Sequence, residues 1–178
     1  FHKNSHSVFI AAADCTGHGV PGAFMSILGS EKLNLAVAQT TDTSAILNCL
    51  NKELKKALHQ SGHKESTRDG MDIALCSINT GARTVKFAGA NRPFWLIRNG
   101  KAETEEIKGT KKAIGGFTED DQHFDTHEIK LHAGDTFYIF SDGYADTFGS
   151  NDSKKLTTKK FRQLLLGIQD KTMHEQGE

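Results

Sequence analysis

The residues best suited to chemistry are aspartates that follow apolar runs and precede glycine-containing loops. Asp14 follows the run SVFIAAA (7–13), and Gly17, Gly19 and Gly22 come shortly after it. A buried carboxylate is costly unless a cation, a hydrogen-bond network or solvent accompanies it. Glycines permit tight turns and close approach of the backbone to a ligand, and the N–H groups at the start of a following helix favour an anion. This combination suits a metal ion that bridges to phosphate.

A second aspartate has the same context. Asp142 follows the apolar run DTFYIFS (135–141) and precedes Gly143. Mg²⁺ and Mn²⁺ prefer oxygen ligands, including carboxylates and backbone carbonyls, and a pair of such ions can activate water and hold a phosphoryl group. An aspartate before glycine also begins ordinary turns, and it can cap a helix. From composition alone, the metal site and the structural turn both remain open.

Three helices are predicted around these aspartates. The first begins near Pro21, a residue that suits the first turn of a helix. Its apolar residues at helical spacing are Phe24, Ile27, Leu28, Leu35 and Ala38. The second helix covers about 43–60, with one apolar stripe and Asp42 or Thr43 as its cap. The third covers about 157–168.

The middle of the chain alternates in the manner of β-strands, with turn sequences between the runs. Together with 7–13, these runs give about seven strands. The predicted strands are 71–78, 84–90, 93–99, 102–108, 124–131 and 135–141. Because helices and strands are segregated along the chain, we expect an α+β fold of two packed, mainly antiparallel sheets with helices on their faces.

Composition narrows the classes of function. The 178 residues suffice for one domain with a substantial core. Lys and Arg number 22 and so do Asp and Glu, so bulk charge predicts neither a nucleic-acid partner nor contact with a membrane surface. No apolar run approaches the roughly 20 residues of a membrane span. The three widely spaced cysteines oppose a disulfide framework and indicate a reducing compartment, for which we expect the cytoplasm.

Four motifs then occur in one order. They are ADCTGHGVPGAFMS (13–26), GMDIALCSI (70–78), FAGANRPFWLIRNG (87–100) and GDTFYIFSDGYADTFG (134–149). This set resembles the SpoIIE branch of the metal-dependent serine/threonine phosphatases, the PPM superfamily. The resemblance implies a β-sandwich flanked by helices in α-β-β-α layers. It implies a partial phosphatase domain over 1–168, followed by a polar tail over 169–178.

The resemblance also implies an activity and its ligands. Members of the family hydrolyse phosphoserine or phosphothreonine on proteins with two Mn²⁺ or Mg²⁺ ions, and a metal-bound water attacks phosphorus. By this likeness, Asp14 bridges both metals, Cys15 supplies its backbone carbonyl and Asp142 binds the second metal. Asp72 is a candidate for a third, weaker site; a place in a turn or facing solvent is the alternative for it.

Two further residues are candidates for catalysis. By the resemblance, His18 could donate a proton to the leaving oxygen, although it lies four residues after Asp14 rather than two, and a hydrogen bond that orders the loop is its alternative role. Arg92 replaces a histidine common in this motif of the family. Its guanidinium offers a forked donor for phosphate, and a surface arginine before a proline is the alternative.

The chain departs from the family pattern at both ends. An acidic motif before the first strand and a late Asp-Asp motif are not found, so the resemblance implies a domain truncated at both ends. Missing edge strands would expose unpaired backbone, which leads us to expect homodimers. The expected partners are a phosphorylated regulatory protein, such as an anti-sigma-factor antagonist, and an upstream sensor domain in a longer bacterial signalling protein. The alternative is a non-catalytic module of the same fold that binds a phosphoprotein or a partner subunit.

Two other phosphate chemistries fit poorly. A cysteine phosphatase needs an arginine six residues after its nucleophile, and the positions six after the three cysteines are Pro21, Lys55 and Ala82. A nucleotide-binding P-loop needs GxxxxGK[ST], which the chain lacks.

Overall fold

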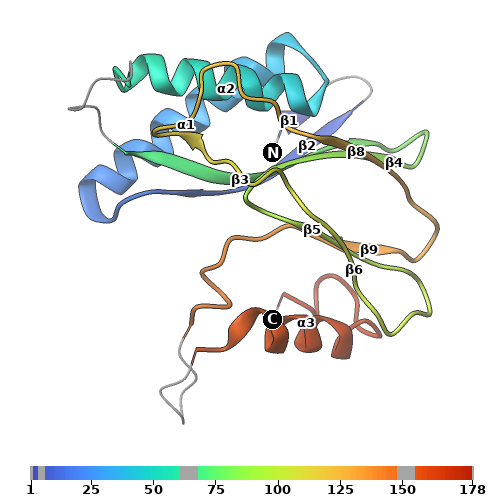
Figure 1. Ribbon diagram of the computed structural model, residues 1–178. Helices are drawn as coiled ribbons and strands as arrows, with labels where there is room; N and C mark the ends of the chain where they lie inside the picture. The colour runs from blue at the N-terminus through green and yellow to red at the C-terminus, as the bar shows by residue number, and fades with distance from the viewer. Residues whose placement is uncertain (1, 4–6, 61–67, 148–154, 178) are drawn as a thin grey trace.

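The fold is a stack of four layers (Figure 1). It is seen in a computed structural model that describes residues 2–3, 7–60, 68–147 and 155–177. Two helices lie on one sheet, a second sheet packs beneath the first, and one helix lies against the outer side of the second sheet. The predicted α+β class and the α-β-β-α order of layers are therefore confirmed.

The first sheet is antiparallel throughout and carries two of the predicted aspartates. Its path runs β1 (His2–Lys3), β2 (Val8–Cys15), β3 (Gly70–Asn79), β4 (Thr84–Ala90) and β8 (Thr126–Lys130), and β7 (Ile114–Gly115) pairs with the start of β3. In the register of β2 with β3, Asp14 lies opposite Asp72. The predicted strands are present, and β1 and β7 are additions too short to leave a periodic signal.

The second sheet is smaller. Its order is β6 (Glu105–Ile107), β5 (Phe94–Ile97) and β9 (Thr136–Tyr138), all antiparallel. The strands predicted over 102–108 and 135–141 are thus real but shorter than expected. Because β9 ends at Tyr138, Asp142 lies in the segment that follows the strand.

Helices α1 (Gly19–Gln39) and α2 (Thr43–Ala57) cover the first sheet, and α3 (Thr157–Gly167) covers the second. Asp42 caps α2 as predicted, because its Oδ1 accepts a hydrogen bond of 2.8 Å from the Ala45 amide. The apolar stripe predicted for α1 is on the wrong side: Phe24, Ile27 and Leu35 are exposed. The buried positions of α1 are Gly22, Met25, Gly29, Ala36 and Val37. The apolar residues of α1 are spread over all sides of the helix, so the helical period of the sequence does not identify the face that packs on the sheet.

Alternation along β3 places side chains in two different cores. Ile73 and Leu75 belong to the cluster between the helices and the first sheet, whereas Ala74 and Cys76 belong to the cluster between the two sheets. Asp72 has the same parity as Ala74, and Asp14 is its partner in the register. Both carboxylates therefore lie on the side of the first sheet that faces the second sheet.

The segment predicted as a polar tail contacts the second sheet. The hydroxyl of Tyr138 donates to Oε1 of Gln176 at 2.6 Å, and Nε2 of Gln169 donates to the same hydroxyl at 2.7 Å. Through Tyr138, the last described residues are tied to β9. None of the helices in the described part of the chain is long and apolar enough to cross a membrane.

Candidate active site

Three carboxylates from both sheets converge on one guanidinium. Nη2 of Arg92 lies 3.0 Å from Oδ2 of Asp14, 2.9 Å from Oδ2 of Asp142 and 3.4 Å from Oδ2 of Asp72. Asp14 and Asp72 come from adjacent strands of the first sheet, and Asp142 follows the last strand of the second. The structure thus brings together the aspartates that the sequence singled out at distant positions.

The position of Arg92 follows from a tight connection between the sheets. Residues 91–93 join β4 of the first sheet to β5 of the second. A Cβ on Gly89 would lie 2.2 Å from the carbonyl oxygen of Arg92, so the backbone passes itself too closely there for any other residue. Asn91 adopts a φ of 57°, and its Nδ2 donates to Oδ1 of Asp72 at 2.8 Å. This connection therefore both aims Arg92 and holds Asp72.

Arg92 is not a surface arginine, since its side chain is only 12% exposed. The alternative prediction of a surface arginine is therefore wrong. The positive charge of the guanidinium offsets the mutual repulsion of the three carboxylates that it contacts. Burial, together with the hydrogen bond and the charge of Asp142, raises the pKa of Asp14 against the opposing effect of Arg92. Burial also acts to raise the pKa of Asp142, but the hydrogen bond and charge of Arg92 prevail and lower it.

Cys15 and His18 occupy different environments in the loop after β2. Cys15 is partly buried against the core beneath α1, and burial raises the pKa of its thiol. A role through its backbone carbonyl is compatible with this placement. His18 is exposed at the N-cap of α1, and in the described residues its side chain makes no capping hydrogen bond. The turn itself depends on Gly17, whose φ is 90°, and on Gly22, where a Cβ would lie 2.7 Å from the Gly17 carbonyl oxygen.

A cavity of about 510 Å³ opens beside the carboxylates. Its lining combines Asp14, Asp72 and Arg92 with residues from the start of β3 and from the segment around β7. The other lining residues are Cys15, Thr16, Arg68, Gly70, Met71, Ala113, Gly115, Gly116, Phe117 and Thr118. Residues 113 and 115–118 therefore form part of the wall of the same cavity as Asp14 and Asp72.

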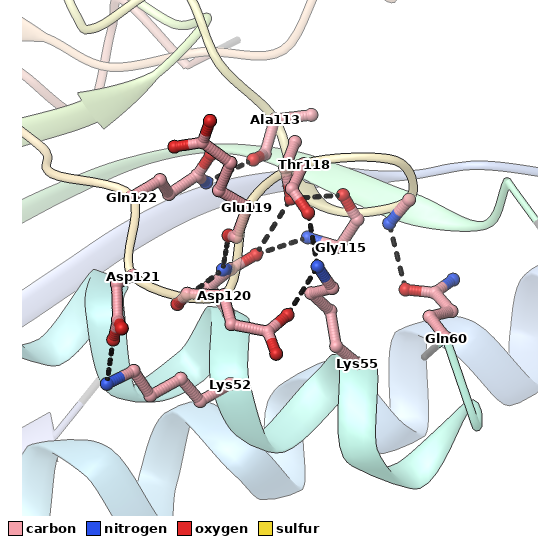
Figure 2. Close-up of polar contacts among 12 residues, drawn as sticks. Lys52, Lys55, Gln60, Ala113, Gly115, Thr118, Glu119, Asp120, Asp121 and Gln122 are labelled. Carbon is pink, nitrogen blue, oxygen red and sulfur yellow. Dashed lines mark hydrogen bonds and ion pairs between the residues drawn. The ribbon is translucent and has the colours of Figure 1, made fainter. Parts of the chain in front are cut away.

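Side chains of α2 and of the turn after it hold that wall in place (Figure 2). We call residues 113–122 the clamped loop. Oδ1 of the fully buried Asn51 accepts from the Gly115 amide at 2.8 Å, and its Nδ2 donates to the Glu119 carbonyl at 2.9 Å. Oε1 of Gln60 accepts from the Gly116 amide at 2.9 Å. Lys55 is also buried; it donates to the Thr118 carbonyl and pairs with Asp120 at 2.5 Å.

Sequence reasoning missed the clamped loop and the partner of Asp72. The paired glycines of IGGF, directly after a short apolar step, were the available signal for a wall built from backbone. Asn91 carried no signal of its own, because only the three-dimensional turn brings it to Asp72. Asn51 and Lys55 look like the polar face of an amphipathic helix, yet the clamped loop covers them.

The carboxylates form an oxygen-rich set around a cation that belongs to the protein. Within the described ranges, no group of three or more His, Cys, Asp or Glu side chains is arranged to hold a metal ion. The guanidinium of Arg92 stands between Asp14 and Asp142 instead. The ligand chemistry suits Mg²⁺ or Mn²⁺, and a bound ion would compete with Arg92 for the same oxygens.

Comparisons with known proteins agree with this fold. The chain is similar to the SiaA-PP2C domain of Pseudomonas aeruginosa, with 28% identity and a TM-score of 0.84 over 98% of this chain and 67% of that one. It is similar in fold to the PP2C phosphatase domain of SpoIIE from Bacillus subtilis, with 18% identity and a TM-score of 0.69 over 97% of this chain and 47% of that one.

A third structure, RsbX in complex with magnesium, shares the fold at 17% identity and a TM-score of 0.60, over 94% of this chain and 76% of that one. The comparison with curated proteins gave no match. The profile of the family described as Stage II sporulation protein E (SpoIIE) matches residues 4–178. The chain therefore belongs to the SpoIIE family, whose solved relatives are phosphatase domains of the PP2C/PPM type.

Proposed function

We propose that this chain is the core of a metal-dependent phosphatase that hydrolyses phosphoserine or phosphothreonine on a regulatory protein. The observation that carries the proposal is the convergence of Asp14, Asp72 and Asp142 on Arg92. Of these residues, Asp14, Asp72 and Arg92 line a cavity. Crowded carboxylates favour a cation, and their oxygens are the ligands that Mg²⁺ and Mn²⁺ prefer. We assign the phosphatase domain to residues 1–168.

Asp14, Asp142 and the Cys15 carbonyl would hold the metal, with Asp72 as a further carboxylate. Two Mn²⁺ or Mg²⁺ ions would supply Lewis acidity and lower the pKa of water. Arg92 would turn its guanidinium from the carboxylates to the oxygens of the phosphoryl group, for which its forked donors are suited. The exposed His18 would stand ready to protonate the leaving serine oxygen.

The proposed setting follows from the family. The substrate would be a phosphorylated regulatory protein in bacterial signalling, such as an anti-sigma-factor antagonist, in the cytoplasm. The chain spans 67% of the SiaA-PP2C chain and 47% of the SpoIIE chain. We therefore propose that a sensor domain and the further acidic ligands come from flanking sequence.

The test is Mn²⁺-dependent hydrolysis of a phosphoserine peptide. It is run on this chain and on a form extended at both ends, with Asp14→Asn in each. Asp170→Asn, which changes an exposed aspartate in the C-terminal segment, is the matched control. We expect turnover by the extended form to depend on Mn²⁺ and to be unchanged in Asp170→Asn. In Asp14→Asn it should fall by about a hundredfold or more, because losing even an outer-shell partner of a metal ligand costs about 10–100-fold. If neither form turns over while both are folded, the phosphatase proposal fails and a non-catalytic module explains the fold better.

A further inference from the structure

An aromatic ring and an arginine lie together on the wall of the cavity. Arg68 places its Cζ 5.1 Å from the centroid of the Phe117 ring, and both residues line the cavity that holds Asp14 and Asp72. Phe117 is 63% exposed. Most of its ring is therefore open for apolar contact with a molecule that enters the cavity.

The loop that carries Phe117 is fixed on both sides of it. Before it, the amides of Gly115 and Gly116 donate to Asn51 and Gln60. After it, Lys55 binds the Thr118 carbonyl (Figure 2). The exposed ring is thus held by a pre-organised loop, which lowers the entropy that a binding partner would have to overcome.

Arg68 brings to this cavity a positive charge that no carboxylate among the described residues neutralises by an ion pair. The other arginine in the lining, Arg92, already faces three carboxylates. Among the described residues Arg68 forms no ion pair, and its contact is the stacking on Phe117. A guanidinium is planar by delocalisation, and one that lies over a ring still has N–H groups at its edge for a bidentate contact with a carboxylate.

The distance from the carboxylates indicates which part of a substrate would reach this pair. Arg68 precedes Asp72 by four residues, so their Cα atoms are at most about 14 Å apart. Phe117 lies two residues after Gly115, which pairs with Gly70 at the start of β3. An extended peptide covers the same span in about four residues. The pair therefore lies within reach of side chains that are near the phosphorylated residue in the chain.

We propose that Arg68 and Phe117 form the recognition element for the polypeptide around the phosphoserine, and that Arg68 selects an acidic side chain within about four residues of it. This proposal rests on the proposed function, because it assumes that the phosphoryl group binds beside Asp14 and Asp142. It adds a substrate class: phosphoproteins in which the modified serine has an acidic neighbour. Phe117 contributes apolar contact with the same segment.

The test compares three substrates on the two forms described above. One phosphoserine peptide carries glutamates on both sides of the phosphoserine, a second carries alanines there, and the third substrate is p-nitrophenyl phosphate. We expect kcat/KM to be roughly fivefold to tenfold higher for the acidic peptide. Arg68→Ala should abolish this preference, and Arg68→Lys should keep part of it. Phe117→Ala should lower kcat/KM for both peptides. Because p-nitrophenyl phosphate has no flanking residues, Arg68→Ala and Phe117→Ala should lower its kcat/KM by less than they lower kcat/KM for the acidic peptide.

The matched control is Arg83→Ala, which removes an exposed arginine in the turn between β3 and β4 that does not line the cavity. A second measurement needs no turnover: binding of the labelled acidic phosphopeptide, followed by fluorescence anisotropy. Arg68→Ala should weaken this binding, and Arg83→Ala should not. Equal binding to both variants overturns the recognition proposal, as does an acidic preference that survives Arg68→Ala. If wild type hydrolyses no substrate yet binds the acidic peptide through Arg68, the phosphatase proposal fails alone.

Discussion

Replacing Asn51 by alanine tests whether α2 holds the wall of the cavity. Asn51 is fully buried and forms four hydrogen bonds to the clamped loop. Its Oδ1 accepts from the Gly115 amide at 2.8 Å, a contact that is itself buried. Asn51→Ala leaves that N–H without a partner, which costs about 1–3 kcal/mol. The two carbonyls on the other side lose a neutral donor, worth about 1 kcal/mol in net terms.

We therefore expect Asn51→Ala to lower the free energy of unfolding by about 3 kcal/mol. Folded domains have about 5–15 kcal/mol in total, so the chain should still fold. Asn48→Ala is the matched control, because the buried Oδ1 of Asn48 has no hydrogen-bond partner in the described structure. Its removal should not lower the free energy of unfolding, because the truncation deletes a buried acceptor that has no partner and alanine has the higher helix propensity.

The assay is urea unfolding followed by the fluorescence of Trp95, the single tryptophan, which is fully buried. Hydrogen exchange of the Gly115 and Gly116 amides then locates the effect. These amides should lose protection in Asn51→Ala and keep it in Asn48→Ala. A loss below about 1 kcal/mol with unchanged Gly115 protection would refute the claim that Asn51 fixes the loop.

Two further predictions concern charges. Arg92→Ala should raise KM for a phosphoserine peptide by about tenfold, because a charge-assisted donor to phosphate is lost. An unchanged KM in the extended form would show that Arg92 does not bind the phosphoryl group. Although burial opposes it, hydrogen bonds from the His132 and Asn99 amides and from Arg98 lower the pKa of Asp135 to about 2. This carboxylate therefore contributes about 2 kcal/mol at neutral pH, and that stability is lost as pH falls from about 4 towards 2. Asp135→Asn should remove it and flatten the acid limb of urea unfolding curves measured across that range, whereas an unchanged limb would contradict the assignment.

The sequence predicted the parts of this molecule that repeat a local pattern. Strands β3 and β4 and helix α2 were placed within a few residues, because their apolar spacing matches one buried face. Asp14 and Asp142 stood out because each follows an apolar run. Such reasoning identifies only features that depend on residues close together in the sequence.

What remained hidden depends on contacts between distant segments. Arg92 lies between two strands, where no period fixes the direction of a side chain, and only the packing of the sheets places it among carboxylates. Asn51 and Lys55 carry polar side chains that a helical pattern assigns to solvent, yet the clamped loop buries them. For α1, apolar residues on every side left the choice of inner face to its packing against β2.

The candidate site depends on how the two sheets sit on each other. Asp14 and Asp72 belong to the first sheet, Asp142 follows the second, and Arg92 lies on the connection between them. The packing that sets this spacing includes Phe87 of β4 and Phe94 of β5, whose ring centroids are 5.4 Å apart. Because protein cores are close-packed and transmit strain, a shift of one sheet against the other would change the distances from Asp142 to the other two carboxylates. Packing between the two sheets therefore sets the distances within the charged site. Arg92 contacts carboxylates from both sides, so its ion pairs depend on how the sheets are aligned.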